Sequence, residues 1–168
     1  LVDVGQNSIM YSYIKSDDIL KDMCGIIESS RKAAYQAVNA ALVQRNWLIG
    51  YRISEEELQG EDRAEYGANI IKRLAKELTA EYGKGYAKSN LYSFYSFYKT
   101  FPNIFQTLSG KLSWSHYAEL LTISDDTART FYEQQCTLEN WSFRAMKRQI
   151  DSSLFERLAL SKDKSAVM

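Results

Sequence analysis

A turn rich in lysine and glycine, near the middle of the chain, carries residue types that suit contact with a phosphate backbone. Lysine binds phosphate as a point charge, and asparagine can form two hydrogen bonds with the edge of an adenine base. In a helix-turn-helix, such residues belong on the turn and on the first turn of the second helix. The five candidates for contact with nucleic acid are Lys84, Lys88, Ser89, Asn90 and Tyr92.

The sequence on either side of this turn predicts two helices. Asp62 begins a capping box that opens a helix through Tyr82, and Gly83 suits a left-handed C-cap. Ser89 is expected to cap a second helix, which ends near residue 100 because a proline follows. Residues 62–100 therefore predict a helix-turn-helix core, whose first helix would cross the DNA backbone.

Positive charge is concentrated in this part of the chain. Residues 63–99 contain seven Lys or Arg against three Asp or Glu, although the whole chain has 21 of each sign and no net charge. An anionic partner of a neutral protein has to meet a local patch of this kind. The alternative is an ordinary solvated face, because short helical hairpins are common in all-α domains.

A second helix-turn-helix pattern covers residues 115–136. Two predicted helices meet there at a turn, and the second carries Arg129 as a candidate phosphate contact. Asp125 and Asp126 would stand at the helix end that approaches the phosphates, and their repulsion opposes docking. The pattern is therefore also compatible with a purely structural copy of the first unit.

The last predicted helix, capped by Ser142 and running to about residue 160, has a compact basic face. Lys147 and Arg148 follow Arg144 by three and four positions, so both lie near it on one side of the helix. Contact with the DNA backbone competes with simple solvation as the role of these residues.

The aromatic residues that follow Ser89 form two stripes on the predicted helix. One stripe is expected in the core and consists of Phe94, Phe97 and Phe101. The other suits stacking on single-stranded bases or a protein interface and consists of Tyr92, Tyr95 and Tyr98.

A long N-terminal helix is predicted from about Ser16, whose side chain and the two following acids mark a helix start, to about Ile49. Apolar residues recur along it at intervals of three and four, and Gly25 is a potential break. Beyond this helix, Ser54 and Glu57 have the spacing of a capping box, which predicts a new helix start. This helix and the aromatic helix could pair two copies as a homodimer or dock a partner protein. Such an interaction module is the alternative to DNA binding.

Several classes of function have little support in the sequence. One histidine, His116, and two distant cysteines do not form the ligand pairs of a metal site, and no phosphate-binding glycine loop occurs. We therefore expect no metal, no other cofactor and no catalytic residue in this segment. The chain lacks an apolar run long enough to span a membrane, and its reduced cysteines fit a cytoplasmic protein.

The fold class expected from these patterns is all-α, with a long N-terminal helix packed on a multi-helix domain that contains helix-turn-helix-like units. The chain divides into an extension at 1–15, a single domain at 16–160 and a tail at 161–168. Residues 101–113 are less regular and suit either a short helix or a wing-like turn.

An ordered series of motifs resembles the N-terminal domain of the YhcG-like family of bacterial proteins. The motifs lie at residues 39–50, 63–67 (RAEYG), 82–86 (YGKGY), 89–91 (SNL), 97–98, 112–117 (LSWSHY), 128–132 (ARTFY) and 140–142 (NWS). The resemblance implies a helical DNA-binding domain joined to a C-terminal nuclease domain of the PDDEXK type.

The nuclease site itself is not expected in this segment. It requires an acid-x-Lys tripeptide behind further acidic metal ligands, and no Asp or Glu in the chain has a lysine two positions later. The leading hypothesis is therefore a DNA-targeting domain that acts beside a separate nuclease domain.

Overall fold

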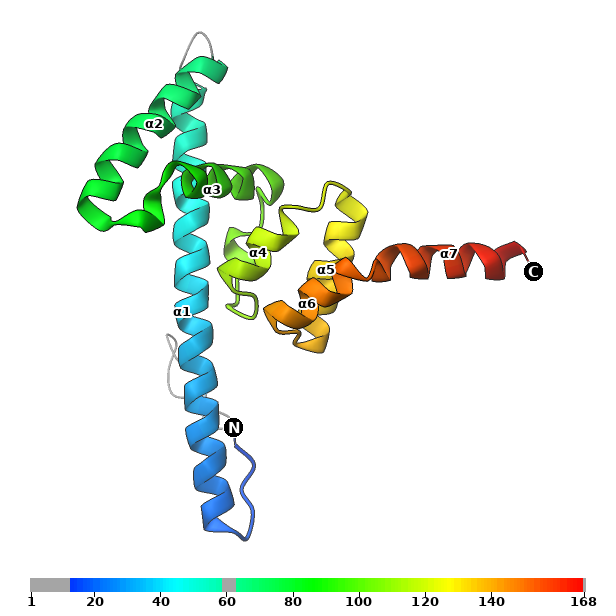
Figure 1. Cartoon of the computed structure of the whole chain (residues 1–168). Helices are drawn as coiled ribbons and strands as arrows, with labels where there is room; N and C mark the ends of the chain where they lie inside the picture. The colour runs from blue at the N-terminus through cyan, green and yellow to red at the C-terminus, as the bar shows by residue number, and fades with distance from the viewer. Residues whose placement is uncertain (1–12, 59–62, 168) are drawn as a thin grey trace.

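The computed structural model describes residues 13–58 and 63–167, and within them the fold is all-α, as predicted. A long first helix forms a rod, and the next three α-helices along the chain contact it (Figure 1). The α-helices are α1 (Ile19–Glu57), α2 (Arg63–Tyr82), α3 (Lys88–Thr100), α4 (Trp114–Leu120), α5 (Asp126–Glu139), α6 (Phe143–Asp151) and α7 (Leu154–Val167). Two single 3-10 turns, η1 (Lys84–Tyr86) and η2 (Phe105–Thr107), lie in the connections.

Helix α1 begins two residues later than the predicted cap. The Asp18 carboxylate accepts hydrogen bonds from the backbone N–H groups of Leu20 and Lys21, so Asp18 is the N-cap. Ser16 lies just ahead of it and donates through its hydroxyl to the Asp22 carboxylate, at 2.8 Å. The helix continues through Gly25 without a break for 39 residues, a length of about 58 Å.

The C-terminal end of α1 corrects one prediction. A capping box starting at Ser54 was expected to open a new helix, but Ser54 and Glu57 lie in the last turn of α1. Ile53 and Ser54 are both buried there, and Ile53 belongs to a core cluster with Leu91 and Phe94. Packing of this turn against α3 therefore outweighs the local capping signal. The predicted capping box at Asp62 lies outside the described residues.

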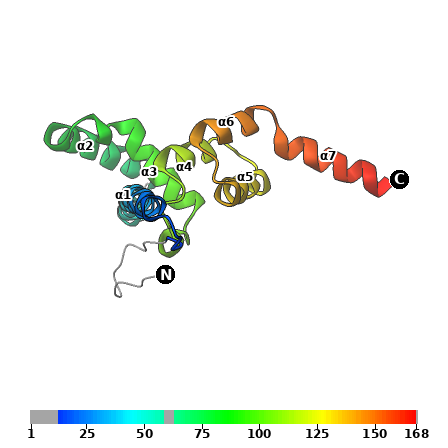
Figure 2. The same cartoon turned by 90° about the horizontal axis from the view of Figure 1, so that it is seen from below.

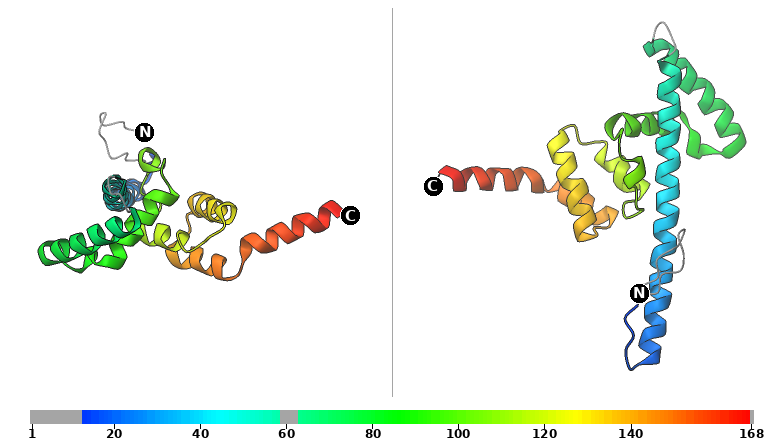
Figure 3. Two further views of the ribbon diagram at one scale, coloured as in Figure 1. Left: turned by 90° about the horizontal axis from the view of Figure 1, so that it is seen from above. Right: turned by 180° about the vertical axis from the view of Figure 1, so that it is seen from behind.

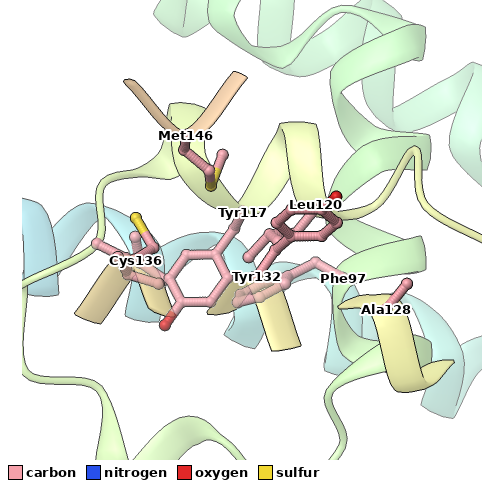
Figure 4. Packing of buried hydrophobic residues seen from close by; sticks show 9 residues of the cluster. Phe97, Tyr117, Leu120, Ala128, Tyr132, Cys136 and Met146 are labelled. Carbon is pink, nitrogen blue, oxygen red and sulfur yellow. The ribbon is translucent and has the colours of Figure 1, made fainter. Parts of the chain in front are cut away.

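Two clusters of buried side chains hold the fold together. The larger one joins α1, α3, α4, α5 and α6, and Figure 4 shows its aromatic and sulfur-containing side chains packed together. Its buried members are Val43, Phe97, Leu112, Tyr117, Leu120, Ala128, Tyr132, Cys136 and Met146. The smaller one joins α1, α2 and α3 through Ile53, Ile71, Ala75, Leu91 and Phe94. Phe94 and Phe97 of the predicted Phe stripe are thus confirmed as core, whereas Phe101, the C-cap of α3, is only partly buried.

The stretch from 101 to 113 is fastened to α1. It contains η2 and turns, and no strand occurs in this fully described stretch. The Trp47 indole donates to the Phe101 carbonyl at 3.0 Å, and the Asn39 amide donates to the Gly110 carbonyl at 3.4 Å. Gly110 has φ +78°, and a Cβ there would lie 1.8 Å from the Gln36 carbonyl oxygen, so only glycine fits this approach.

The predicted last helix is divided in two. Helix α6 ends at Asp151, Ser153 has a left-handed φ of 56°, and α7 starts at Leu154. The Tyr132 hydroxyl accepts a hydrogen bond from the Phe155 N–H at 3.0 Å, which ties the start of α7 to α5. Beyond this contact α7 projects away from the other helices and continues through residues 161–167, where the sequence suggested a frayed tail (Figure 1).

Candidate nucleic-acid interface

The predicted lysine turn forms a tight corner between α2 and α3. Gly83, with φ +94°, ends α2, the single turn η1 follows, and α3 starts at Lys88. Ala87, and not the predicted Ser89, is the N-cap of α3, and it provides no side-chain cap. Ser89 lies inside the first turn because η1 already sets the direction of the chain before that residue.

Lys84 and Lys88 are exposed on this corner. The Lys88 ammonium lies 6.0 Å from the centre of the Tyr92 ring, and Tyr92 is itself 38% exposed. In the part of the chain that the structure describes, neither lysine forms an ion pair with a carboxylate. Both charges are therefore available to an anionic partner.

The Asn90 side chain stabilises the same corner. Its side-chain amide donates to the carbonyls of Lys84 and Gly85, at 3.4 and 3.2 Å. Reading adenine requires the donor and the acceptor of the same amide, and here the donor group holds the turn. In this conformation Asn90 positions the two lysines and has no free donor for a base.

Arg129, the candidate from the second helix-turn-helix pattern, is turned into the protein. Its side chain is only 12% exposed and pairs with Asp126 at 2.6 Å. The same guanidinium donates to the Ile123 carbonyl, which fixes the turn between α4 and α5. Arg129 therefore links the turn to α5, and little of its charge is presented to solvent.

The basic face of α6 contains both paired and unpaired cations. Lys147 lies 3.3 Å from Glu119 and 3.6 Å from Asp151, and the hydrogen bond with Glu119 raises its pKa. Arg144 and Arg148 are exposed, and no carboxylate in the described ranges pairs with either. They are four residues apart, so they stand on one side of α6.

The turn between α5 and α6 is a tight connection that the sequence patterns did not single out as a candidate site. Asn140 has left-handed dihedral angles, φ 51° and ψ 43°, and ends α5. Ser142 accepts a hydrogen bond from the Ala145 N–H at 3.2 Å and caps α6. An asparagine followed two residues later by a capping serine was the available signal, because Asn tolerates the left-handed conformation.

His116 fixes this turn from the side of α4. Its ring is buried, Nδ1 accepts the backbone N–H of Ser113 at 3.0 Å, and Nε2 lies 2.9 Å from the Trp141 carbonyl. Because Nδ1 is an acceptor, Nε2 carries the proton and donates to Trp141. Helices α4, α5 and α6 are thus joined into one unit beneath Arg144 and Arg148.

Replacing His116 by alanine should therefore destabilise this unit. The change leaves the Ser113 N–H without its partner and the Trp141 carbonyl with only the weak Cys136 thiol donor at 3.5 Å, and it opens a cavity, at a cost of about 3 kcal/mol. We expect the midpoint of thermal unfolding, followed by circular dichroism, to fall by roughly 10 °C. Ser115→Ala, at an exposed neighbouring position, is the control, and an equal effect of both changes would contradict the assigned role of His116.

The two basic elements flank α1, one on either side of it in Figure 1. Viewed along α1, helices α2, α3 and α6 are all displaced to one side of the rod (Figure 2; Figure 3, left). Lys84 and Lys88 stand at the corner between α2 and α3, and Arg144 and Arg148 stand on α6. Together these four residues form the unpaired cationic set of the candidate interface.

The described residues contain no cluster of three or more His, Cys, Asp or Glu side chains arranged to hold a metal ion. Among the described helices, none combines the length and the apolar character that crossing a bilayer requires. Burial raises the pKa of the Cys136 thiol to about 11, which makes its thiolate scarce at neutral pH.

Comparison with known proteins confirms the resemblance. A family model described as the DUF1016 N-terminal domain matches residues 22–157. A protein of Escherichia coli (strain K12) named "Putative nuclease YhcG" is 35% identical in an alignment 174 residues long. The alignment covers 85% of this chain and 46% of that protein. The chain therefore spans about half the length of this relative. No solved structure matched the chain.

Proposed function

Because the chain belongs to the family of DUF1016 N-terminal domains, we propose that it is a DNA-binding domain that targets a nuclease domain lying elsewhere in the full protein. The name of the E. coli relative supports nucleic acid as the partner. The proposal assigns no catalytic step to the present segment and no cofactor. Its role is to hold DNA beside a separate active site.

The observation that carries the proposal is the unpaired cationic set, which lies at the corner between α2 and α3 and on α6. Lys147 and Arg129, by contrast, form ion pairs with carboxylates. Lys84, Lys88, Arg144 and Arg148 remain exposed without a carboxylate partner in the described residues. Cations that are exposed and have no carboxylate partner can bind phosphate groups.

Helix α6 is the proposed reading element. It follows a three-residue turn, as the recognition helix of a helix-turn-helix does, and its first turn carries Arg144. Arginine can bind guanine bidentately or contact phosphate. The lysines at the corner between α2 and α3 are assigned to the phosphate backbone, which they would bind without sequence preference.

Fluorescence anisotropy with labelled duplex DNA across a salt series tests this function. If the four cations each neutralise one phosphate, the logarithm of affinity falls with the logarithm of salt with a slope of about −3.6. Affinity then drops by about 150-fold between 50 and 200 mM salt. Absence of binding at low salt, or binding that salt does not weaken, would refute the proposal.

A second candidate function is pairing of two copies of the chain. The observation that favours it is a row of exposed apolar side chains on α1, among them Leu20, Ile27 and Leu48, which is separate from the cationic set.

A further inference from the structure

A hollow lined by basic side chains lies between α1 and the stretch from 101 to 113, which runs beside α1 (Figure 1). Its cations are Arg31 and Lys32 of α1 and Lys111 of the stretch, and all three are exposed. The volume is about 460 Å³, within the range of roughly 300–1,000 Å³ that holds small ligands. This cationic hollow has room for one nucleotide and contains none of the four cations of the candidate interface.

The backbone brings Lys111 to α1. Gly110 approaches the Gln36 carbonyl so closely that a Cβ would overlap it, and the Asn39 amide donates to the Gly110 carbonyl at 3.4 Å. Lys111 follows Gly110 directly and lines the same hollow as Lys32, although the two lysines are distant in sequence. The hollow is therefore a product of the fold and not of neighbouring residues on one helix.

Positive charge exceeds negative charge in the cationic hollow. Glu28 is the carboxylate among its lining residues, and it lies 3.5 Å from the Arg31 guanidinium. Within residues 13–58 and 63–167, neither Lys32 nor Lys111 forms an ion pair with a carboxylate. Each of the two elements therefore contributes one unpaired lysine, which suits an anionic ligand such as phosphate.

Tyr35 adds an aromatic surface to this hollow. Its side chain is 74% exposed, and none of the described aromatic rings packs against it. An exposed aromatic ring among cations is the combination that sites for single-stranded nucleic acid use. The bases of a duplex are stacked on one another, so only an unpaired base offers its face to such a ring.

We propose that the cationic hollow binds an unpaired nucleotide of single-stranded DNA. The base stacks on Tyr35, and Lys32 and Lys111 bind the phosphates that flank it. The choice of DNA as the nucleic acid rests on the function proposed above. Every base has a face on which to stack, so this site holds a single strand without sequence preference.

Fluorescence anisotropy with a labelled deoxythymidine oligonucleotide of about twelve nucleotides, which forms no duplex, tests the stacking. Tyr35→Ala should lower the affinity about tenfold, whereas Tyr35→Phe keeps the ring and should stay within about twofold of the parent. Tyr35 is exposed, so neither change should lower the unfolding temperature. Absence of binding, or equal affinities of the two variants, would overturn the proposal.

The salt dependence of the same oligonucleotide tests the two lysines. Lys32→Gln together with Lys111→Gln should make the slope of log affinity against log salt shallower by about 1.4, since each contact to a single-strand phosphate contributes about 0.7. Lys162→Gln together with Lys164→Gln removes the same charge from exposed positions on α7 and should leave the slope unchanged. An equal change of slope in both double variants would contradict the assignment of the phosphates to the hollow.

Duplex DNA distinguishes this proposal from the proposed function. Tyr35→Ala should leave duplex affinity within about twofold of the parent, because paired bases are not available for stacking. A parent chain that fails to bind duplex refutes the proposed function, whereas oligonucleotide binding that is independent of Tyr35 refutes only the hollow. An equal loss of affinity for duplex and single strand on Tyr35→Ala would overturn the assignment to unpaired bases.

Photo-cross-linking locates the contact directly. An oligonucleotide that carries bromodeoxyuridine should, after irradiation and digestion with trypsin, be attached to the peptide at residues 33–45, in which Tyr35 is the only aromatic residue. The cross-link should be lost in Tyr35→Ala. Attachment solely to other peptides would overturn the proposal.

Discussion

Replacing Arg144 and Arg148 together by glutamate should lower the affinity for duplex DNA by about 100-fold at low salt. Each change removes a contact to phosphate or base and places a negative charge beside the DNA, which we expect to cost about 1.4 kcal/mol per site. Neither side chain has a carboxylate partner among the described residues, and both are exposed, so the fold should tolerate the substitutions. Anisotropy measures the affinity, and thermal unfolding verifies the fold.

A matched charge reversal on another helix tests whether the α6 face or the net charge of the chain determines the affinity for DNA. Lys162 and Lys164 are exposed on α7, which projects away from the rest of the protein. Their double replacement by glutamate changes the net charge by the same amount, and we expect less than a threefold loss of affinity. If both double variants weaken binding equally, the charge of the whole chain and not the α6 face governs the interaction.

The helices of this protein follow from local sequence signals wherever those signals agree with the core. The period of Phe94 and Phe97 predicted a buried stripe, and both side chains are buried in the structure. The capping signal at Ser54 failed because Ile53 and Ser54 pack against α3, a contact distant in sequence. A capping box contributes about 1 kcal/mol, which is less than the burial of a single large apolar side chain.

The sequence predicted only part of the candidate interface. Lys84 and Lys88 were predicted as exposed cations at a turn, and the structure places them so. Sequence could not distinguish Arg129 from Arg144, because both are arginines in the first turn or two of a capped helix. Only the fold shows that Ile123 and Asp126 engage the first and that no carboxylate in the described residues pairs with the second.

The crossing of α1 and α3 depends on a glycine whose importance the sequence does not reveal. Gly50 is buried in the interior of α1, and among the described helices α1 and α3 form the most extensive pairwise contact. A Cβ at this position would lie 2.0 Å from the Phe94 carbonyl oxygen and 3.1 Å from the Tyr98 Cβ. The oxygen belongs to the backbone of a helix, so it cannot move aside as a side chain does.

Gly50→Ala should therefore destabilise the protein although alanine is the better helix former. The gain in helix propensity is about 1 kcal/mol, whereas separating two packed helices to admit the methyl group should cost at least about 4 kcal/mol. The expected net loss of about 3 kcal/mol lowers the midpoint of thermal unfolding by roughly 10 °C. Gly85→Ala is the control, because a Cβ there meets no atom within 4 Å and its φ is not left-handed. An unchanged midpoint for Gly50→Ala would mean that α1 and α3 do not approach as closely as described, and the placement of the Lys84 corner relative to α1 would then have to be revised.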